Sequence, residues 1–187
     1  MFKRVENNIN LAQVENEISN YWDEIDAFQT SLNNRKNDKI FRFYDGPPFP
    51  TGSPHYGNLL AGVIKDIVPR YWTMRGYYVE RRFGWDVHGL PIEMEVQKNL
   101  NLEDPQQIDE YGIGKFNEDC RTQVQTNTEN WEKITRKIGR WVDFENDYKT
   151  MDIDFMESVW WVFKELWEKD LIYQDYKVLP YSWAAST

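Results

Sequence analysis

The stretch from residue 40 to residue 83 constrains the fold most, because its hydrophobic pattern changes from strand to helix and back to strand. Residues 40–44 are aromatic or β-branched at most positions and stop at Asp45-Gly46, which predicts a short buried strand. Residues 59–74 place apolar side chains on one broad helical face, and residues 77–83 predict a second strand. Strands joined by a single helix pair in parallel, with the helix packed on the sheet. The chain is therefore predicted to be an α/β protein.

Local signals refine this unit and the segment before it. Pro69 lies inside the helical run and has no N–H to donate, so we expect a kink or a local break there. Gly76 follows the last apolar position, as expected just beyond a helix C-terminus. Residues 12–28 carry apolar side chains mostly three and four positions apart, which predicts a first helix, whereas residues 31–39 are polar and turn-like.

The rest of the chain is predicted to be mainly helical. Residues 92–100 predict a short helix, and Asp104-Pro105 supplies an N-cap and a first-position proline for another. Asp154-x-x-Glu157 resembles a capping box and opens a Trp-rich helix, most simply interpreted as core, and residues 171–179 predict a strand. Between these segments a long amphipathic run carries its apolar side chains at Phe116, Cys120, Val124, Trp131, Ile134, Ile138 and Trp141.

Composition excludes several kinds of protein. The net charge of −9 argues against a nonspecific nucleic-acid coat, which needs excess Lys and Arg, although a local patch could still bind RNA. A single cysteine, Cys120, rules out a disulfide framework and, with only two histidines, makes a structural zinc site improbable. No apolar stretch approaches 18 residues and residues 1–10 show no signal-peptide pattern, so we expect no membrane association and a cytosolic location.

The turn before the predicted helix at 59–74 is rich in proline and glycine, since residues 43–58 read FYDGPPFPTGSPHYGN. A helix N-terminus offers unpaired N–H groups and the positive end of the helix dipole, which suit a phosphate. Glycine lets the backbone approach a ligand closely, and proline fixes the turn before binding. His55 and Asn58 lie three positions apart, so both face one side and can donate to phosphate oxygens. The alternative is that Pro54-His55 is only a loop segment ahead of a helix.

A second candidate site follows the second predicted strand, in the turn predicted for residues 84–91, which reads GWDVHGLP. Ligands of open α/β sheets bind at the carboxyl ends of the strands. Asp86 could pair with a ligand ammonium group, because a partly buried carboxylate is costly without a cation. The alternative is that Asp86 only satisfies backbone groups in the turn, and Trp85 is first interpreted as packing.

These two segments resemble the signatures of one enzyme family. GPPFPTGSPHYGN is similar to the first signature, the HIGH element, of class I aminoacyl-tRNA synthetases, and GWDVHGLPIE after RRF resembles the isoleucyl branch. The similarity continues through KFNEDCR, ESVWW and KVLPYS and covers nearly the whole chain. It implies the first half of a Rossmann-like nucleotide-binding fold with parallel strands, carrying a helical insertion. Residues 1–38 would be an N-terminal helical extension, and residues 39–187 the N-terminal half of the catalytic domain.

The resemblance also implies a reaction and the residues that serve it. The family joins isoleucine to ATP, supplied with Mg²⁺, as an aminoacyl-adenylate, and then transfers the aminoacyl group to tRNA(Ile). Carried over by motif, the catalytic pair would be His55 and Asn58. The ATP-binding residues would be Gly46, Pro48, Gly52, His55, Gly57 and Asn58, and the amino-acid site would comprise Pro47, Trp85, Asp86 and His88. The complete enzyme is expected to be a monomer in the cytoplasm.

Three departures from the family pattern bear on these expectations. Position 58 is Asn where this branch usually has a second His, and Asn can donate to a phosphate but cannot carry charge. Some members place a zinc knuckle where this chain reads PYSWAAS, and without cysteine there we expect no zinc. The second signature, Lys-Met-Ser-Lys-Ser, does not occur in these 187 residues. We therefore expect half a catalytic site.

Two other functions are compatible with the residues. A small nucleotidyltransferase also uses a His-containing turn on ATP phosphates, although the insertion from residue 101 to residue 152 and the GWDVHGLP loop argue against it. A non-catalytic module that only binds nucleotide or tRNA is the third possibility.

Overall fold

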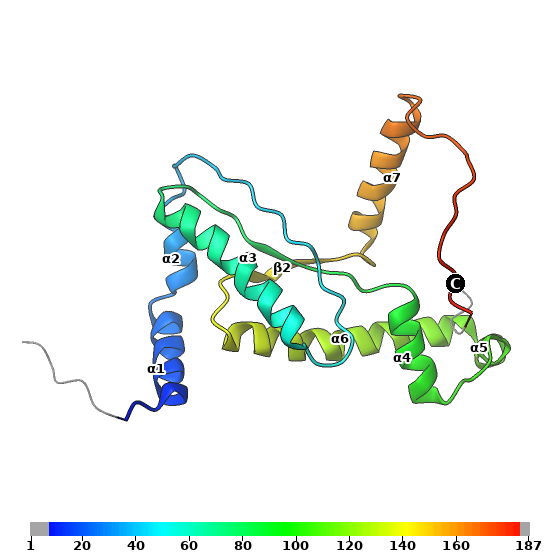
Figure 1. Ribbon diagram of the computed structural model, residues 1–187, viewed down its shortest axis with the longest axis horizontal. Helices are drawn as coiled ribbons and strands as arrows, with labels where there is room; N and C mark the ends of the chain where they lie inside the picture. The colour runs from blue at the N-terminus through cyan, green and yellow to red at the C-terminus, as the bar shows by residue number, and fades with distance from the viewer. Residues whose placement is uncertain (1–7, 184–187) are drawn as a thin grey trace, which may run out of the picture. The chain divides into compact units, whose positions relative to one another are not determined.

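The structure is a computed structural model that describes residues 8–183, apart from the side chain of Pro105. The chain divides into two compact units, Met1–Met151 and Asp152–Thr187. This division leaves the predicted boundary after residue 38 untested. The elements of the described residues are α1 (Leu11–Glu24), α2 (Ala27–Asn33), α3 (Tyr56–Met74), β1 (Arg82–Trp85), α4 (Leu90–Leu100), α5 (Pro105–Tyr111), α6 (Ile113–Lys137), β2 (Asp143–Lys149) and α7 (Ile153–Trp167), as labelled in Figure 1.

The sheet of the first unit is a parallel pair, β1 with β2. The partner of Arg82 is Asp143 and that of Gly84 is Tyr148, so β2 bulges between the two pairs. The Asp143 carboxylate holds the bulge by accepting from two N–H groups within it. Gly84 is required because a Cβ there would lie 2.1 Å from the ring of Tyr148. Strand β2 was not predicted, because its sequence, DFENDYK, is too polar to indicate a strand.

The two predicted strands of the opening unit are shorter or shifted in the structure. Within residues 40–44 only Ile40 forms a bridge, parallel, with Tyr78. That bridge confirms the parallel direction, but the prediction of a buried strand is wrong: Ile40 is 54% exposed. The second strand begins at Arg82 rather than at residue 77, and it extends into the predicted turn as far as Trp85.

Helix α3 begins three residues before its predicted start and continues through Pro69 without a break. It ends as predicted, since Gly76 follows with a φ of 88°. The expectation that its apolar face packs on the sheet is wrong, because only Gly62 and Pro69 of this helix are buried. Local contacts hold it: Arg70 donates to the carbonyl of Gly139 from the segment that follows α6, and Trp72 stacks on Phe41 with ring centroids 4.7 Å apart.

The core lies where β1 and β2 meet α4 and α6, and Figure 1 shows α4 beside α6. It consists of Phe83, Trp85, Val87, Ile92, Val124, Trp131, Val142 and Phe144. The predicted helix at 92–100 is confirmed and starts two residues earlier. The predicted N-cap is also confirmed, because Asp104 accepts from the N–H of Gln106. Gln107, which was not predicted to take part, reaches back to the N–H of Asp104.

The N-terminal helix is interrupted. Asp26 adopts a φ of 45° and separates α1 from α2, so the single helix predicted for residues 12–28 is wrong. Helix α2 then occupies part of the segment predicted as a turn. Trp22 of α1 packs edge-on against Trp141 with ring centroids 5.3 Å apart, which attaches this extension to the unit.

In the second unit, α7 starts after Asp152, so Asp154 lies in its first turn and the predicted capping box is wrong. None of its side chains is buried and Trp160 is 71% exposed, so the interpretation of this helix as core is also wrong for the described residues. Residues 171–179 form no strand, because no ladder pairs with them in the described part of the chain. The helices described within residues 8–183 include none with both the length and the apolar character of a membrane span.

Candidate functional site: the N-terminus of α3 and the end of β1

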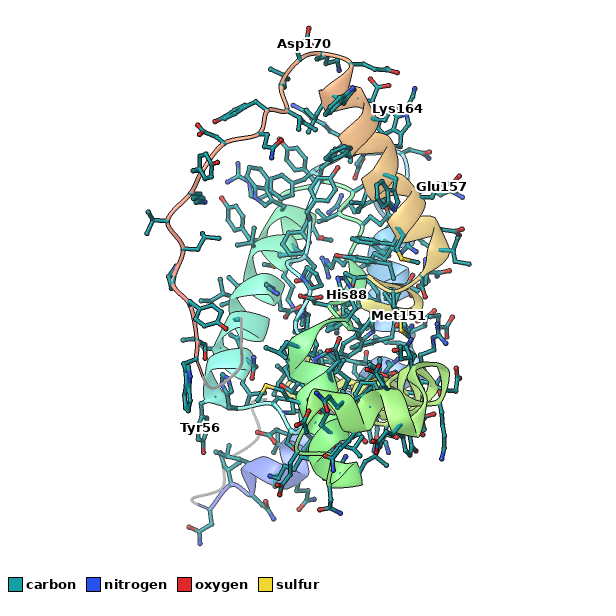
Figure 2. The ribbon with its side chains drawn as sticks, turned by 90° about the vertical axis from the view of Figure 1, so that its right-hand side faces the viewer. Tyr56, His88, Met151, Glu157, Lys164 and Asp170 are labelled. Carbon is teal, nitrogen blue, oxygen red and sulfur yellow. The ribbon has the colours of Figure 1, made fainter. Side chains whose placement is uncertain are left out.

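His55 is the N-cap of α3, at the end of the helix that Figure 2 marks with Tyr56. Its Nδ1 atom accepts from the N–H of Gly57 at 3.1 Å, and the Asn58 side chain accepts from the N–H of His55 at 3.0 Å. The pair therefore closes a reciprocal cap, a role in which each side chain acts as an acceptor. Sequence reasoning placed both residues on one side of the helix start but did not predict that they hold the backbone there.

The cap leaves donors available toward solvent. Since Nδ1 of His55 accepts, a neutral imidazole carries its proton on Nε2 and can donate from an exposed position. Asn58 accepts through Oδ1, so its amide NH₂ is the donor that it can offer a ligand. A Cβ at Gly57 would lie 2.9 Å from Cε1 of the imidazole, so a larger residue there would displace the His55 ring from its capping position. The arrangement suits an anion at the helix N-terminus.

The Pro/Gly-rich turn is attached to helix α6. The indole Nε1 of Trp131 donates to the carbonyl of Gly52 at 2.8 Å, and the Asn130 amide donates to the hydroxyl of Ser53 at 3.2 Å. Gly52 has a φ of 55°, a conformation that favours glycine. The turn therefore has a fixed position relative to the core before any ligand arrives.

A buried carboxylate, which sequence reasoning missed, lies under the turn. The Asp45 side chain is 0% exposed and forms ion pairs with Lys65 of α3, at 2.7 Å, and with Arg140. Lys65 also donates to the carbonyl of Gly46. Gly46 itself is exposed and Pro47 is half-buried. The network joins the start of the turn to α3 and to the segment after α6, so it fixes the direction in which residues 46–54 leave the core.

The two motifs are joined directly. The N–H of Asp86, at the end of β1, donates to the carbonyl of Pro48 in the turn at 2.9 Å. The Asp86 carboxylate is half-buried and accepts from the hydroxyl of Thr150 at 3.3 Å. His88, labelled in Figure 2, is exposed and its Nδ1 lies 2.8 Å from the same hydroxyl. The structure thus brings Asp86 and His88 together through a residue that sequence reasoning did not select.

Trp85 lies in the core. It is 1% exposed, and its indole N–H donates to the Asp147 carboxylate at 2.7 Å. These contacts support the packing interpretation, so we leave Trp85 out of the proposed ligand site. Its neighbour Tyr148 has its pKa raised by burial and by the negative charge of Asp45, which keeps the phenol neutral beside Gly84.

Metal ligands do not cluster in the described residues: no group of three or more His, Cys, Asp or Glu side chains among residues 8–183 is placed to hold an ion. The expectation that no zinc binds at PYSWAAS concerns residues 180–186. Residues 184–186 of this segment lie outside the described residues.

Residues 17–187 match the family model of class I tRNA synthetases for I, L, M and V, and the chain belongs to that family. It is 55% identical over 173 residues to the cytoplasmic isoleucine–tRNA ligase of Arabidopsis thaliana, covering 92% of this chain and 14% of that protein. It is 52% identical over 186 residues to the isoleucine–tRNA ligase of Bdellovibrio bacteriovorus, covering 100% of this chain and 18% of that protein. The chain thus spans less than a fifth of the length of these relatives.

A solved structure supports the fold. The LeuRS of Agrobacterium radiobacter K84, crystallised in a ternary complex with tRNA and LeuAMS, matches with a TM-score of 0.60 and 24% identity, over 86% of this chain and 18% of that chain. The fold is therefore that of part of a Rossmann-like class I catalytic domain, a helix-rich α/β arrangement with parallel strands, as predicted from the sequence.

Proposed function

We propose that this chain supplies the first half of the activation site of an isoleucine–tRNA ligase. The observation that carries the proposal is the direct hydrogen bond between the two motifs, from the Asp86 N–H to the Pro48 carbonyl. This bond supports the proposal because it holds the segment that carries the Asp86 carboxylate against the turn that leads to the N-terminus of α3. The 50 to 55% identity to proteins named isoleucine–tRNA ligase supports isoleucine as the amino acid.

In this proposal ATP meets the N-terminus of α3. The donors are the His55 Nε2–H and the Asn58 amide NH₂, which contact the phosphates at the positive end of the helix dipole. The N–H groups of Gly57 and Asn58 are already bonded within the cap. Gly46, Pro48, Gly52 and Gly57 allow the nucleotide to approach the backbone. Mg²⁺ accompanies ATP as part of the substrate. Asp86 holds the ammonium group of isoleucine, with His88 and the backbone at Pro47 as neighbours.

The reaction then needs little covalent chemistry from the protein. A carboxylate oxygen of isoleucine attacks the α-phosphorus of ATP, the bond to the β-phosphate oxygen breaks, and pyrophosphate leaves with the electron pair. Catalysis by these residues consists of positioning and of stabilising negative charge on the phosphates. Transfer of the aminoacyl group to tRNA(Ile) follows, in a cytoplasmic enzyme that we expect to be a monomer.

Isoleucine-dependent exchange of labelled pyrophosphate into ATP tests the proposal in the full-length protein that contains this chain. We expect exchange that requires isoleucine and is lost with leucine. A nucleotidyltransferase would exchange without any amino acid, and a binding module would bind ATP without exchange. Either of these results would refute the proposal.

A further inference from the structure

Thr150 occupies the position directly after β2 and faces the end of β1. Its backbone N–H donates to the carbonyl of Trp85 at 3.0 Å, which continues the pairing of the two strands by one residue. The residue is 7% exposed. Its hydroxyl therefore has a fixed position in a buried environment, next to the loop that carries Asp86 and His88.

The hydroxyl has three partners, and its one proton and two lone pairs can serve all of them. It accepts from the N–H of Val87 at 3.0 Å. The Asp86 carboxylate, at 3.3 Å, can only accept when ionised, so the Thr150 proton points to it. Nδ1 of His88, at 2.8 Å, must then be the donor to the remaining lone pair. In this arrangement a neutral His88 carries its proton on Nδ1 and leaves Nε2 as an acceptor.

We propose that Thr150 is a positioning residue of the amino-acid site, which orients the Asp86 carboxylate and sets the tautomer of His88. The inference rests on the proposed function, because it takes the ligand of Asp86 to be the ammonium group of isoleucine. An ammonium group donates three hydrogen bonds and needs acceptors held in place. Thr150 holds one such acceptor directly and keeps an imidazole nitrogen in its accepting form. Its loss should therefore affect the binding of the amino acid and leave the binding of ATP unchanged.

Three variants of the full-length protein test this in the pyrophosphate-exchange assay. Thr150→Val keeps the shape and removes the hydroxyl, and we expect KM for isoleucine to rise about 10- to 100-fold, the scale of losing a hydrogen bond to a charged group. KM for ATP should stay within about twofold, since that site lies at the N-terminus of α3. Thr150→Ser retains the hydroxyl and should restore KM for isoleucine to within about threefold of wild type. Thr126→Val, on the exposed face of α6, is the matched control and should change neither constant.

The outcomes separate the two proposals. If the wild type shows normal exchange and Thr150→Val leaves the KM for isoleucine unchanged, the role of Thr150 is overturned and the proposed function stands. Equal rises in both KM values, or no restoration by Thr150→Ser, also overturn it, because they indicate a structural role. An absence of isoleucine-dependent exchange in the wild type refutes the proposed function and the role of Thr150 with it.

A second measurement does not depend on how the variants fold. The chain has only two histidines, and the structure assigns them opposite tautomers: a proton on Nε2 for His55 and on Nδ1 for His88. Proton–nitrogen correlation spectra of the imidazole rings, recorded at a pH where both are neutral, distinguish these forms. We expect one histidine of each kind. Two Nε2–H histidines in the wild type would show that Thr150 does not hold His88 as proposed.

Discussion

Replacing Asp45 with alanine is expected to destabilise the chain more than any surface substitution. The carboxylate has no exposed surface, and its two cationic partners differ: Arg140 is almost completely buried, whereas Lys65 is about a quarter exposed. Removing one partner of a buried ion pair leaves the other charge uncompensated, at a cost of about 3–5 kcal/mol. The uncompensated charge is mainly that of Arg140, because Lys65 can reach solvent.

Thermal unfolding of the purified chain, followed by tryptophan fluorescence, measures this loss. For a chain of this size each kcal/mol lowers Tm by about 2–4 °C, so Asp45→Ala should lower it by roughly 6–20 °C. The matched control is Asp38→Ala, which breaks the ion pair with Arg35 on the surface and should cost less than about 1 kcal/mol. Equal losses in the two variants would refute the reasoning, because the buried network would then contribute no more than a surface pair.

Three further predictions concern single side chains. In the full-length protein His55→Ala should slow adenylate formation by roughly 10²–10³, which is the effect of losing one preorganised donor. The KM for isoleucine should change little. An unchanged rate of pyrophosphate exchange would remove His55 from the mechanism. Asn58→His should be tolerated and Asn58→Leu should not, because only the former keeps a polar side chain at the cap; equal exchange rates for the two variants would contradict this. Burial, with Glu93 and Asp119 nearby, raises the pKa of the Cys120 thiol to about 11, so the thiol stays protonated at pH 8. Its alkylation by iodoacetamide at pH 8 should then be roughly 100-fold slower than that of an unperturbed cysteine. The rate should keep rising with pH up to about 11, whereas that of an unperturbed thiol levels off near its own, lower pKa. A rate equal to that of free cysteine would contradict the burial argument.

Features set by a few adjacent residues could be predicted from the sequence. Asp104 is the predicted N-cap, Gly76 ends α3, and His55 lies at the start of that helix with Asn58 on the same side. In each case the interaction joins residues within one helical turn, so spacing alone determines it. The parallel direction of the Ile40–Tyr78 bridge could also be predicted, because a single crossover helix, α3, favours that arrangement.

Features that depend on distant pairing could not be predicted. The hydroxyl of Thr150 meets the N–H of Val87 across 63 positions, and Asp45 meets Arg140 across 95. Nothing near either residue in the sequence indicates its partner, and β2, which places Thr150, is too polar to stand out. The burial of α7 could not be predicted either. The periodicity of its sequence predicts an apolar face, but it does not indicate which surface, if any, covers that face.

The central claim is that ATP phosphates bind at the N-terminus of α3, and an ATP titration of the ¹⁵N-labelled chain tests it most directly. We expect the backbone amide signals of Gly57 and Asn58 to be among those that shift most, with a Kd on the order of millimolar because only one side of the triphosphate is held. The same titration of His55→Ala should give a clearly weaker response. Shifts confined to other parts of the chain, or an identical response from the variant, would contradict the account.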